Sequence, residues 1–214
     1  MKTTFLKDCT GVVLAGGENR RMPVLKGFIE VGGTKIIERN LGILKRLFSE
    51  VFIITNQPEL YSYPGVPMFG DIYNVRGPMS GIFTALVNAS NKWIFVCACD
   101  MPFINTELVR YMASKREGFD IVAPRRDRDR AEPLFAFYSN NVLISFEKLL
   151  LEGNRGITDF LLKHDKRVKY ITPDEIKRSD PDLRSFINLN TPEDVDLHLD
   201  FQDRLKFKKG LQRR

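Results

Sequence analysis

Short apolar segments alternate with segments of helical periodicity along most of the chain, and this alternation restricts the fold more than any other feature of the sequence. Regular alternation of strands and helices predicts an α/β protein of three layers, with helices covering a mostly parallel sheet. Strands are predicted at 11–15, 51–55, 93–99, 119–123, 134–138 and 184–189. Helices are predicted at 35–48, 79–90, 105–115, 141–151 and 157–163.

Two helix starts carry capping residues. Asn105 stands directly before a segment of helical periodicity, where its side chain is suited to accept hydrogen bonds from the first free N–H groups. Thr191, Pro192 and Glu193 combine a capping hydroxyl, a proline at the first helical position and an acid in the first turn. A further helix is therefore predicted to begin at Pro192.

The length and the charge of the chain limit the possible domain organisation. A chain of 214 residues with 43% hydrophobic and 28% charged residues is typical of one globular domain with a substantial core. The net charge is +6, and part of the excess lies in the last residues of the chain. We expect one domain over 1–204, followed by a basic and disordered tail over 205–214.

Cysteine usage and apolar patterning bear on location. Cys9, Cys97 and Cys99 are an odd number in a chain too large to depend on disulfides, which favours a reducing compartment. No apolar run is long enough to span a membrane, and residues 1–10 lack the apolar stretch of a secretory signal. We therefore expect a cytoplasmic protein that does not contact membranes.

The first predicted strand runs into Leu14-Ala15-Gly16-Gly17, and a basic loop with Arg20, Arg21 and Lys26 follows. Glycines let backbone N–H groups approach a phosphate or a base closely, and the cations suit a triphosphate. The segment lacks the Gly-Lys-Ser/Thr of a Walker loop and the G-x-G-x-x-G dinucleotide fingerprint, which argues against a P-loop NTPase and a dehydrogenase. A glycine pair also marks many ordinary turns.

The third predicted strand ends in Asp100, and Pro102 follows two residues later. In parallel sheets, ligands bind at the carboxyl ends of the strands, and a carboxylate there suits Mg²⁺ with substrate phosphates. A turn-capping role for Asp100 is an equally good interpretation. Cys97 and Cys99 are interpreted as core residues, because His164 and His198 lie far from them and no metal-ligand set is complete.

Three further segments contain polar groups without a decisive motif. Asp71 ends an apolar segment, and the residues from Arg76 to Gly81 open a helix. Asn188 and Asn190 flank Leu189, where their amides could bind a polar heterocycle or cap the next helix. The basic run 125–130 is either a solvated turn, which is the better-supported interpretation, or an anion site.

Taken together in this order, the motifs resemble those of the molybdenum cofactor guanylyltransferases, within the wider nucleotidyltransferases that begin with L-A-G-G. The resemblance spans about residues 11–194 and is most specific at its closing motif. The matching segments are Leu14 to Gly17 with Arg21, Met22 and Lys26, Gly77 to Gly81, Asp100-Met101-Pro102, Pro133 to Tyr138, and Asn188 to Asp194.

The resemblance implies a Rossmann-like, three-layer fold of the nucleotide-diphospho-sugar transferase type, and transfer of GMP from GTP to molybdopterin with Mg²⁺. It implies catalytic roles for Arg21, Lys26 and Asp100, with Asp100 holding the metal. Asn188 and Asn190 are implied on the pterin side. Transient contact with molybdoenzymes or other cofactor-biosynthesis proteins is also expected. The implied GTP-binding residues are Leu14, Ala15, Gly16, Gly17, Lys26, Asn56, Asp71 and Asp100.

Two departures from the family pattern keep other functions open. Pro23 replaces a glycine and removes an N–H group, and Leu25 replaces an aspartate beside the triphosphate. The alternatives are a cytidylyl- or sugar/polyol-phosphate nucleotidyltransferase of the same fold, and a GTP-binding module without catalysis. A nucleic-acid binder is suggested only by the pI of about 9.2, and no recognition motif supports it.

Overall fold

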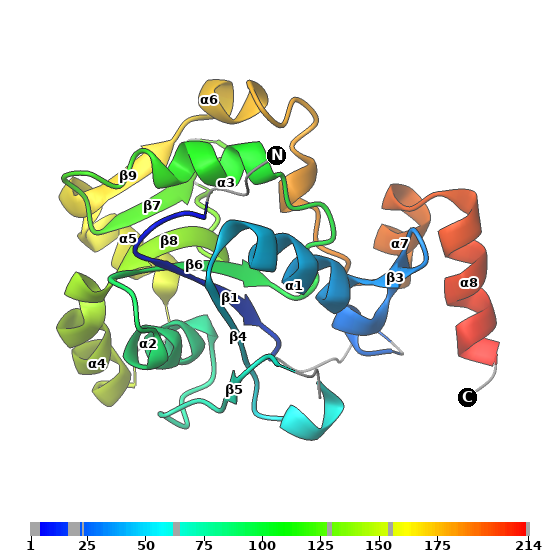
Figure 1. Ribbon diagram of the computed structural model, residues 1–214, viewed down its shortest axis with the longest axis horizontal. Coiled ribbons are helices and arrows are strands. Elements are labelled where there is room, and N and C mark those ends of the chain that lie inside the picture. The colour runs from blue at the N-terminus through cyan, green and yellow to red at the C-terminus, as the bar shows by residue number, and fades with distance from the viewer. Residues whose placement is uncertain are drawn as a thin grey trace.

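Figure 1 shows a computed structural model of the chain, which describes residues 5–16, 22, 24–61, 65–127, 130–153 and 156–212, with only the helical backbone for 209–212. Its main element is a seven-stranded sheet in the order β5-β4-β1-β6-β8-β7-β9. The strands are β1 (Cys9–Leu14), β4 (Glu50–Ile54), β5 (Met68–Phe69), β6 (Trp93–Ala98), β7 (Ile121–Pro124), β8 (Phe135–Ser139) and β9 (Val168–Ile171).

The strand directions place most carboxyl ends at one edge of the sheet. β1 pairs in parallel with both β4 and β6, and β4 pairs in parallel with β5. β8 runs antiparallel to both of its neighbours, β6 and β7, while β7 and β9 are parallel. Every strand of this sheet except β8 therefore ends at the same edge, which confirms the predicted mostly parallel sheet.

Helices cover both faces of the sheet, as the three-layer prediction requires (Figure 1). Along β6, Phe95 and Cys97 belong to the core under α1 and α3, and Ile94 and Val96 belong to the core under α2, α4 and α5. Alternate side chains of a strand point to opposite faces, so a central strand covered on both sides is apolar throughout. The helices are α1 (Ile36–Leu47), α2 (Pro78–Asn88), α3 (Thr106–Ala113), α4 (Leu143–Leu151), α5 (Ile157–Lys163) and α6 (Pro173–Lys177).

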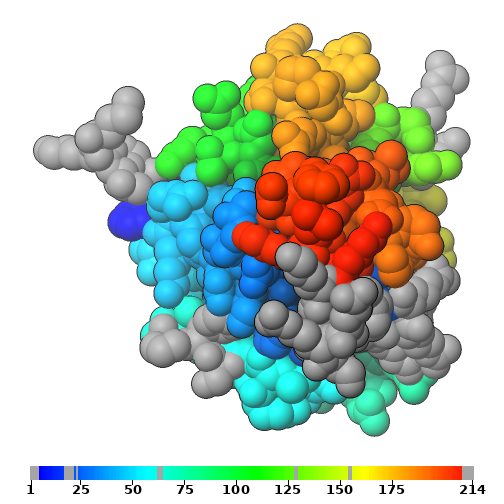
Figure 2. Space-filling model, turned by 90° about the vertical axis from the view of Figure 1, so that its right-hand side faces the viewer, coloured from blue at the N-terminus to red at the C-terminus, as the bar shows by residue number. Residues whose placement is uncertain are grey.

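A third, smaller core lies beside the sheet rather than on its faces. It joins the segment with Met22, Ile29 and Val31 to the C-terminal helices α7 (Pro192–His198) and α8 (Phe201–Gln212). The β2–β3 hairpin (Glu30–Val31 and Thr34–Lys35) is fixed to α8 by a 2.6 Å hydrogen bond from the Gly32 N–H to Asp203 Oδ2. Figure 2 shows the orange and red C-terminal surface lying directly against the blue surface of this early segment.

The predicted helix caps are present. Asn105 Oδ1 accepts hydrogen bonds from the N–H groups of Glu107 and Leu108, at 2.9 and 3.0 Å. At α7, Thr191 Oγ1 accepts from the Asp194 N–H at 3.3 Å. The cysteine prediction is also confirmed, because Cys97 and Cys99 are free and buried, and burial raises the pKa of Cys99 to about 12.

Two segments have a structure other than the one predicted for them. The predicted strand at 184–189 is wrong: residues Arg184–Phe186 form a 3₁₀ turn (η5), because the Asp180 carboxylate accepts hydrogen bonds from the N–H groups of Arg184 and Ser185. The expected disordered tail is helical over 205–212 as part of α8, where Phe207 is buried in the third core. The first segment forms a turn because a local carboxylate caps it, and the second is an ordered helix because one of its aromatic side chains is buried.

A pair of glycine substitutions tests this packing. Gly42 lies within α1 and a Cβ there has nothing within 4 Å among the described residues, so Gly42→Ala should raise the free energy of unfolding by about 0.5–1 kcal/mol. At Gly11 a Cβ would lie 2.7 Å from Phe48 Cδ2, so Gly11→Ala should cost about 1–3 kcal/mol. Urea denaturation measures both, and equal effects of the two substitutions would contradict the packing.

Candidate functional site

Four adjacent strands each end in a candidate residue at the carboxyl edge of the sheet. In strand order, Asp71 follows β5, Asn56 follows β4, Gly16 follows β1 and Asp100 follows β6. Ligands of open α/β sheets bind at this edge, because loops and helix ends converge there. The topology therefore brings together residues that are up to 84 positions apart in sequence, from Gly16 to Asp100.

Lys26, Asp100 and Asn190 form the centre of the site. Lys26 Nζ lies 3.3 Å from Asp100 Oδ2 and also donates a hydrogen bond to Asn190 Oδ1. The Leu189 N–H donates to the Asp100 carbonyl at 3.0 Å, which fixes the closing motif against the end of β6. Three segments far apart in sequence thus meet at one ammonium group.

The second oxygen of Asp100 bears on metal binding. Oδ1 is buried and has no hydrogen-bond partner within the part of the chain that the structure describes. Among these residues, no group of three or more His, Cys, Asp and Glu side chains is arranged so that it could hold a metal ion. Magnesium is often held by one or two carboxylates with substrate phosphates and water, and a single free carboxylate oxygen fits that mode.

Asn56 and Asp71 form a second polar pair on the other side of β1. Asn56 Nδ2 donates to Asp71 Oδ2 at 2.9 Å, and the Asp71 N–H donates to Asn56 Oδ1 at 2.7 Å. Asp71 Oδ1 is buried without a hydrogen-bond partner among the residues described. Burial raises the pKa of Asp71, and the hydrogen bond from Asn56 offsets this only in part.

Sequence analysis missed the two side chains that hold the Asp71 loop. Thr84 Oγ1 accepts a 2.9 Å hydrogen bond from the Ile72 N–H, and Ser80 Oγ donates to the Tyr73 carbonyl at 2.7 Å. Both hydroxyls project from α2 and are buried. The signal for them was present, because buried hydroxyls in an otherwise apolar helix require polar partners.

The described residues at the end of β1 are held to both neighbouring strands. The Ala15 N–H bonds to the Ile54 carbonyl at 2.9 Å, and the Cys99 N–H bonds to the Leu14 carbonyl at 3.0 Å. Gly16 is exposed, and a Cβ built on it meets no described atom within 4 Å. Among the described residues, packing gives no reason for a glycine at this position. Gly17, Arg21 and Pro23 lie outside the described residues.

The two asparagines of the closing motif have different surroundings. Asn190 contacts Lys26 with its side chain, while Thr191 caps α7, so the possibility that Asn190 is only a cap is excluded. Asn188 Oδ1 is buried and unpartnered within the described ranges. Both asparagines flank Leu189, which is bonded to Asp100, so they lie next to the candidate metal ligand.

The arginines of the basic run lie after β7 and have partners nearby. The Arg125 guanidinium stacks on the Tyr170 ring at 3.7 Å, and Arg126 forms an ion pair with the buried Glu132. Arg130 Nε lies 3.5 Å from Asp127 Oδ2. Residues 128 and 129 lie outside the described part of the chain.

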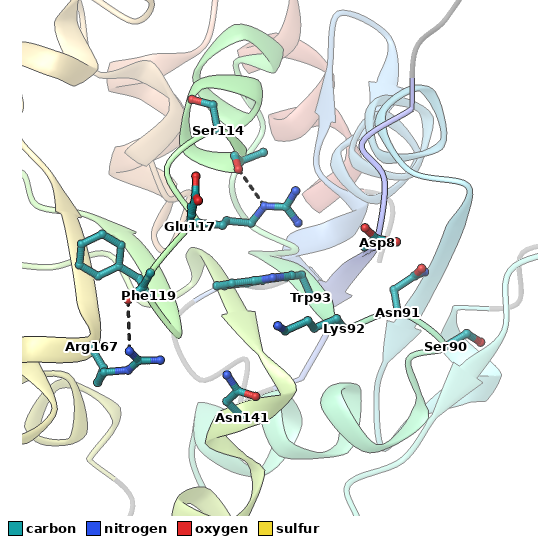
Figure 3. Close-up of a pocket in the computed structure, with 13 residues that line it drawn as sticks. Asp8, Ser90, Asn91, Lys92, Trp93, Ser114, Glu117, Phe119, Asn141 and Arg167 are labelled. Atoms are coloured by element: carbon teal, nitrogen blue, oxygen red, sulfur yellow. Dashed lines mark hydrogen bonds between the residues drawn. The ribbon is translucent and has the colours of Figure 1, made fainter.

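A cavity of about 800 Å³ lies at the opposite edge of the sheet, before β1 and β6 (Figure 3). Its arginines stabilise the protein itself: Arg116 Nε donates to the Ala113 carbonyl at 2.8 Å and Arg167 binds Asp120 at 2.8 Å. The side chains at the carboxyl edge, by contrast, include buried polar atoms without partners among the described residues. We therefore place the functional site at the carboxyl edge.

Comparison with known proteins gives consistent matches. The profile of the family described as "MobA-like NTP transferase domain" matches residues 11–168. A "probable molybdenum cofactor guanylyltransferase" of Pelotomaculum thermopropionicum is 38% identical over 188 residues, covering 88% of this chain and 90% of the relative. The molybdenum cofactor guanylyltransferase of Syntrophotalea carbinolica is 33% identical over 192 residues, covering 89% and 90%.

A solved structure agrees with these matches. The crystal structure of molybdopterin-guanine dinucleotide biosynthesis protein A from Archaeoglobus fulgidus superposes with a TM-score of 0.76 at 26% identity, covering 94% of this chain and 99% of that one. No helix within the described residues is long and apolar enough to cross a membrane.

The half-buried Asp71 generates a prediction on pH dependence. A carboxyl whose pKa is raised by folding binds more protons in the native than in the unfolded state, so it lowers stability as pH rises through its titration range. Asp71→Asn should therefore gain stability relative to the unaltered protein as pH rises from below the usual pKa of an aspartate, about 4, to neutral pH. Urea denaturation across this range measures the effect, and parallel pH profiles of the two proteins would contradict it.

Proposed function

The chain belongs to the molybdenum cofactor guanylyltransferases within the MobA-like NTP transferases, and we propose that it transfers GMP from GTP to molybdopterin and releases pyrophosphate. The observation that carries this proposal is the meeting of Lys26, Asp100 and Asn190 at the carboxyl edge of the sheet. A cation and a carboxylate at this edge suit a triphosphate and its metal.

The proposed reaction needs no nucleophile from the protein. A phosphate oxygen of molybdopterin attacks the α-phosphorus of GTP, the bond to the β-phosphate oxygen breaks, and pyrophosphate leaves. Catalysis then depends on holding the two substrates in line and on stabilising negative charge on the phosphoryl oxygens.

Charge stabilisation is assigned to the centre of the site. Lys26 neutralises phosphate oxygens from its place beside Asp100, and we assign Arg21 of the neighbouring loop the same role. Asp100 would hold Mg²⁺ through its free Oδ1, and the ion when bound supplies further positive charge at the phosphates. Asp100 also keeps Lys26 beside the position of the metal.

The two substrates are assigned to opposite sides of this centre. We assign the guanine nucleotide to the segment Leu14, Ala15, Gly16 and Gly17 and to the Asn56–Asp71 pair. Among the residues that the structure describes, Asp71 Oδ1 has no hydrogen-bond partner and a Cβ on Gly16 meets nothing within 4 Å, and both findings support this assignment. We assign the pterin to Asn188 and Asn190, because Asn188 Oδ1 has no hydrogen-bond partner among the described residues and both asparagines flank Leu189, which bonds to the Asp100 carbonyl.

The departures at Pro23 and Leu25 are proposed to be tolerated. Leu25 stands directly before the 3₁₀ turn η1 (Lys26–Phe28) in extended backbone, and Lys26 still reaches Asp100 and Asn190. We also retain a cytoplasmic location and transient contact with the proteins that receive the cofactor. The three free and buried cysteines agree with a reducing compartment.

Pyrophosphate release tests the proposal directly. The protein is incubated with Mg²⁺, molybdenum-loaded molybdopterin and, in separate reactions, GTP, CTP, ATP or UTP. We expect release with GTP that depends on the pterin. Release with CTP would instead favour a cytidylyltransferase of the same fold, and GTP binding without release would favour a non-catalytic module.

Asp100→Asn is the matched variant for this assay. It removes the anionic metal ligand at nearly constant volume and retains the backbone hydrogen bond from Leu189. We expect transfer to fall by at least about 100-fold, because a metal contributes several kcal/mol of charge stabilisation. The Tm should fall, because Lys26 loses the negative charge of its partner, and retained activity of the folded variant would overturn the metal assignment.

Gly16 supplies a separate prediction about nucleotide binding. Since a Cβ there meets no described atom within 4 Å, Gly16→Ala should leave the free energy of unfolding within about 0.5 kcal/mol. If Gly16 is open so that a nucleotide can approach the backbone, the same change should weaken GTP binding by roughly tenfold or more. Calorimetric titration with GTP measures this, and unchanged affinity would place the nucleotide elsewhere.

A further inference from the structure

Lys26 lies on a short element that does not fix it firmly by itself. The 3₁₀ turn η1 has three residues and no side-chain cap, and its backbone is held by hydrogen bonds among residues 25–29. The lysine side chain is flexible, with up to about 2 kcal/mol of rotamer entropy to lose on being ordered. The place of its ammonium group therefore depends on the partners it finds.

Those partners account for two of its three N–H donors. Asp100 Oδ2 and Asn190 Oδ1 each accept one hydrogen bond from Lys26 Nζ. An ammonium group has three donors, so one remains for an oxygen of a bound phosphate. With two partners fixed, the direction of the third N–H is fixed as well.

Asn190 is itself held by Asp194. The Asp194 carboxylate accepts a 2.8 Å hydrogen bond from the Asn190 N–H and a 2.9 Å hydrogen bond from the Thr191 N–H. Thr191 Oγ1 accepts in return from the Asp194 N–H, so the start of α7 forms a capping box. The backbone that carries the Asn190 side chain is therefore anchored on a helix.

The third core supports the same arrangement. It packs Met22 and Ile29, which flank Lys26 in sequence, against Leu189 and Val195, which flank Asn190. All four side chains are at most 5% exposed. The segment that carries Lys26 and the motif that carries Asn190 are thus packed against each other in one core.

We propose that Asn190, anchored by Asp194, is a positioning residue that orients the Lys26 ammonium group for the triphosphate of the nucleotide. This inference rests on the proposed function and adds to it, because Asn190 then serves the nucleotide side of the site as well as the pterin side. The start of α7 consequently sets nucleotide affinity without touching the nucleotide.

GTP binding measured without pterin separates this role from a pterin contact. Asn190→Ala should weaken the Kd for GTP about tenfold, the size of one hydrogen bond to a charged group. In a Lys26→Gln background the same substitution should have no further effect, because Asn190 acts through the ammonium group. The four proteins form a double-mutant cycle.

A matched pair of variants tests whether the Asp194 carboxylate holds Asn190 in place. Asp194→Ala removes the carboxylate of the capping box at α7, and Glu175→Ala removes the carboxylate of the equivalent box at α6. Both should lower the Tm, but only Asp194→Ala should weaken GTP binding. Asp194→Asn keeps an oxygen acceptor and should restore most of the affinity.

The outcomes are distinct. Additive effects of the Asn190 and Lys26 substitutions, or an unchanged Kd for GTP in Asn190→Ala, would overturn the inference and leave the proposed function intact. Equal losses of affinity in Asp194→Ala and Glu175→Ala would show a general effect of stability and also overturn it. A lack of GTP binding by the unaltered protein would overturn the proposed function itself.

Discussion

The hydrogen bonds of one ammonium group connect the main sheet of this structure with its C-terminal helices. Lys26 bonds to Asp100 at the end of β6 and to Asn190 before α7, so the sheet and the C-terminal helices meet at its Nζ atom. Asp100 is buried, and removing a buried carboxylate from water is costly unless a cation accompanies it. Lys26 is that cation, and the loop around it must therefore fold back over the edge of the sheet.

Much of the fold could be predicted because its signals are local and repeated. Every strand predicted before residue 140 exists, since a buried parallel strand is apolar throughout, as β6 is. The strand β9 was missed because it is the outermost strand on one side of the sheet, and its residues Lys169 and Tyr170 are only partly buried. The tail was misjudged because the burial of Phe207 depends on residues almost two hundred positions earlier, such as Met22.

The residues of the candidate site likewise differ in how far the sequence could predict their places. Asp100 could be placed from sequence, because it directly follows an apolar strand, whereas Asn56 was implied only by the family resemblance. The contact of Lys26 with Asn190 could not be predicted, since 164 residues separate them and no sequence pattern indicates that they pair. Asp194 was recognised only as the last residue of the closing motif, which says nothing of the residue that its carboxylate holds.

The third core also has a consequence for the order in which the chain folds during synthesis. Domains fold as the chain emerges from the ribosome, amino-terminal parts first. Strands β1, β4 and β6 can pair once residue 98 has emerged, but Met22 and Ile29 lack their partners until Leu189 to Phe207 have been made. The sheet is thus assembled early, and the lysine is put in place only after the residues of α7 and α8 have been made.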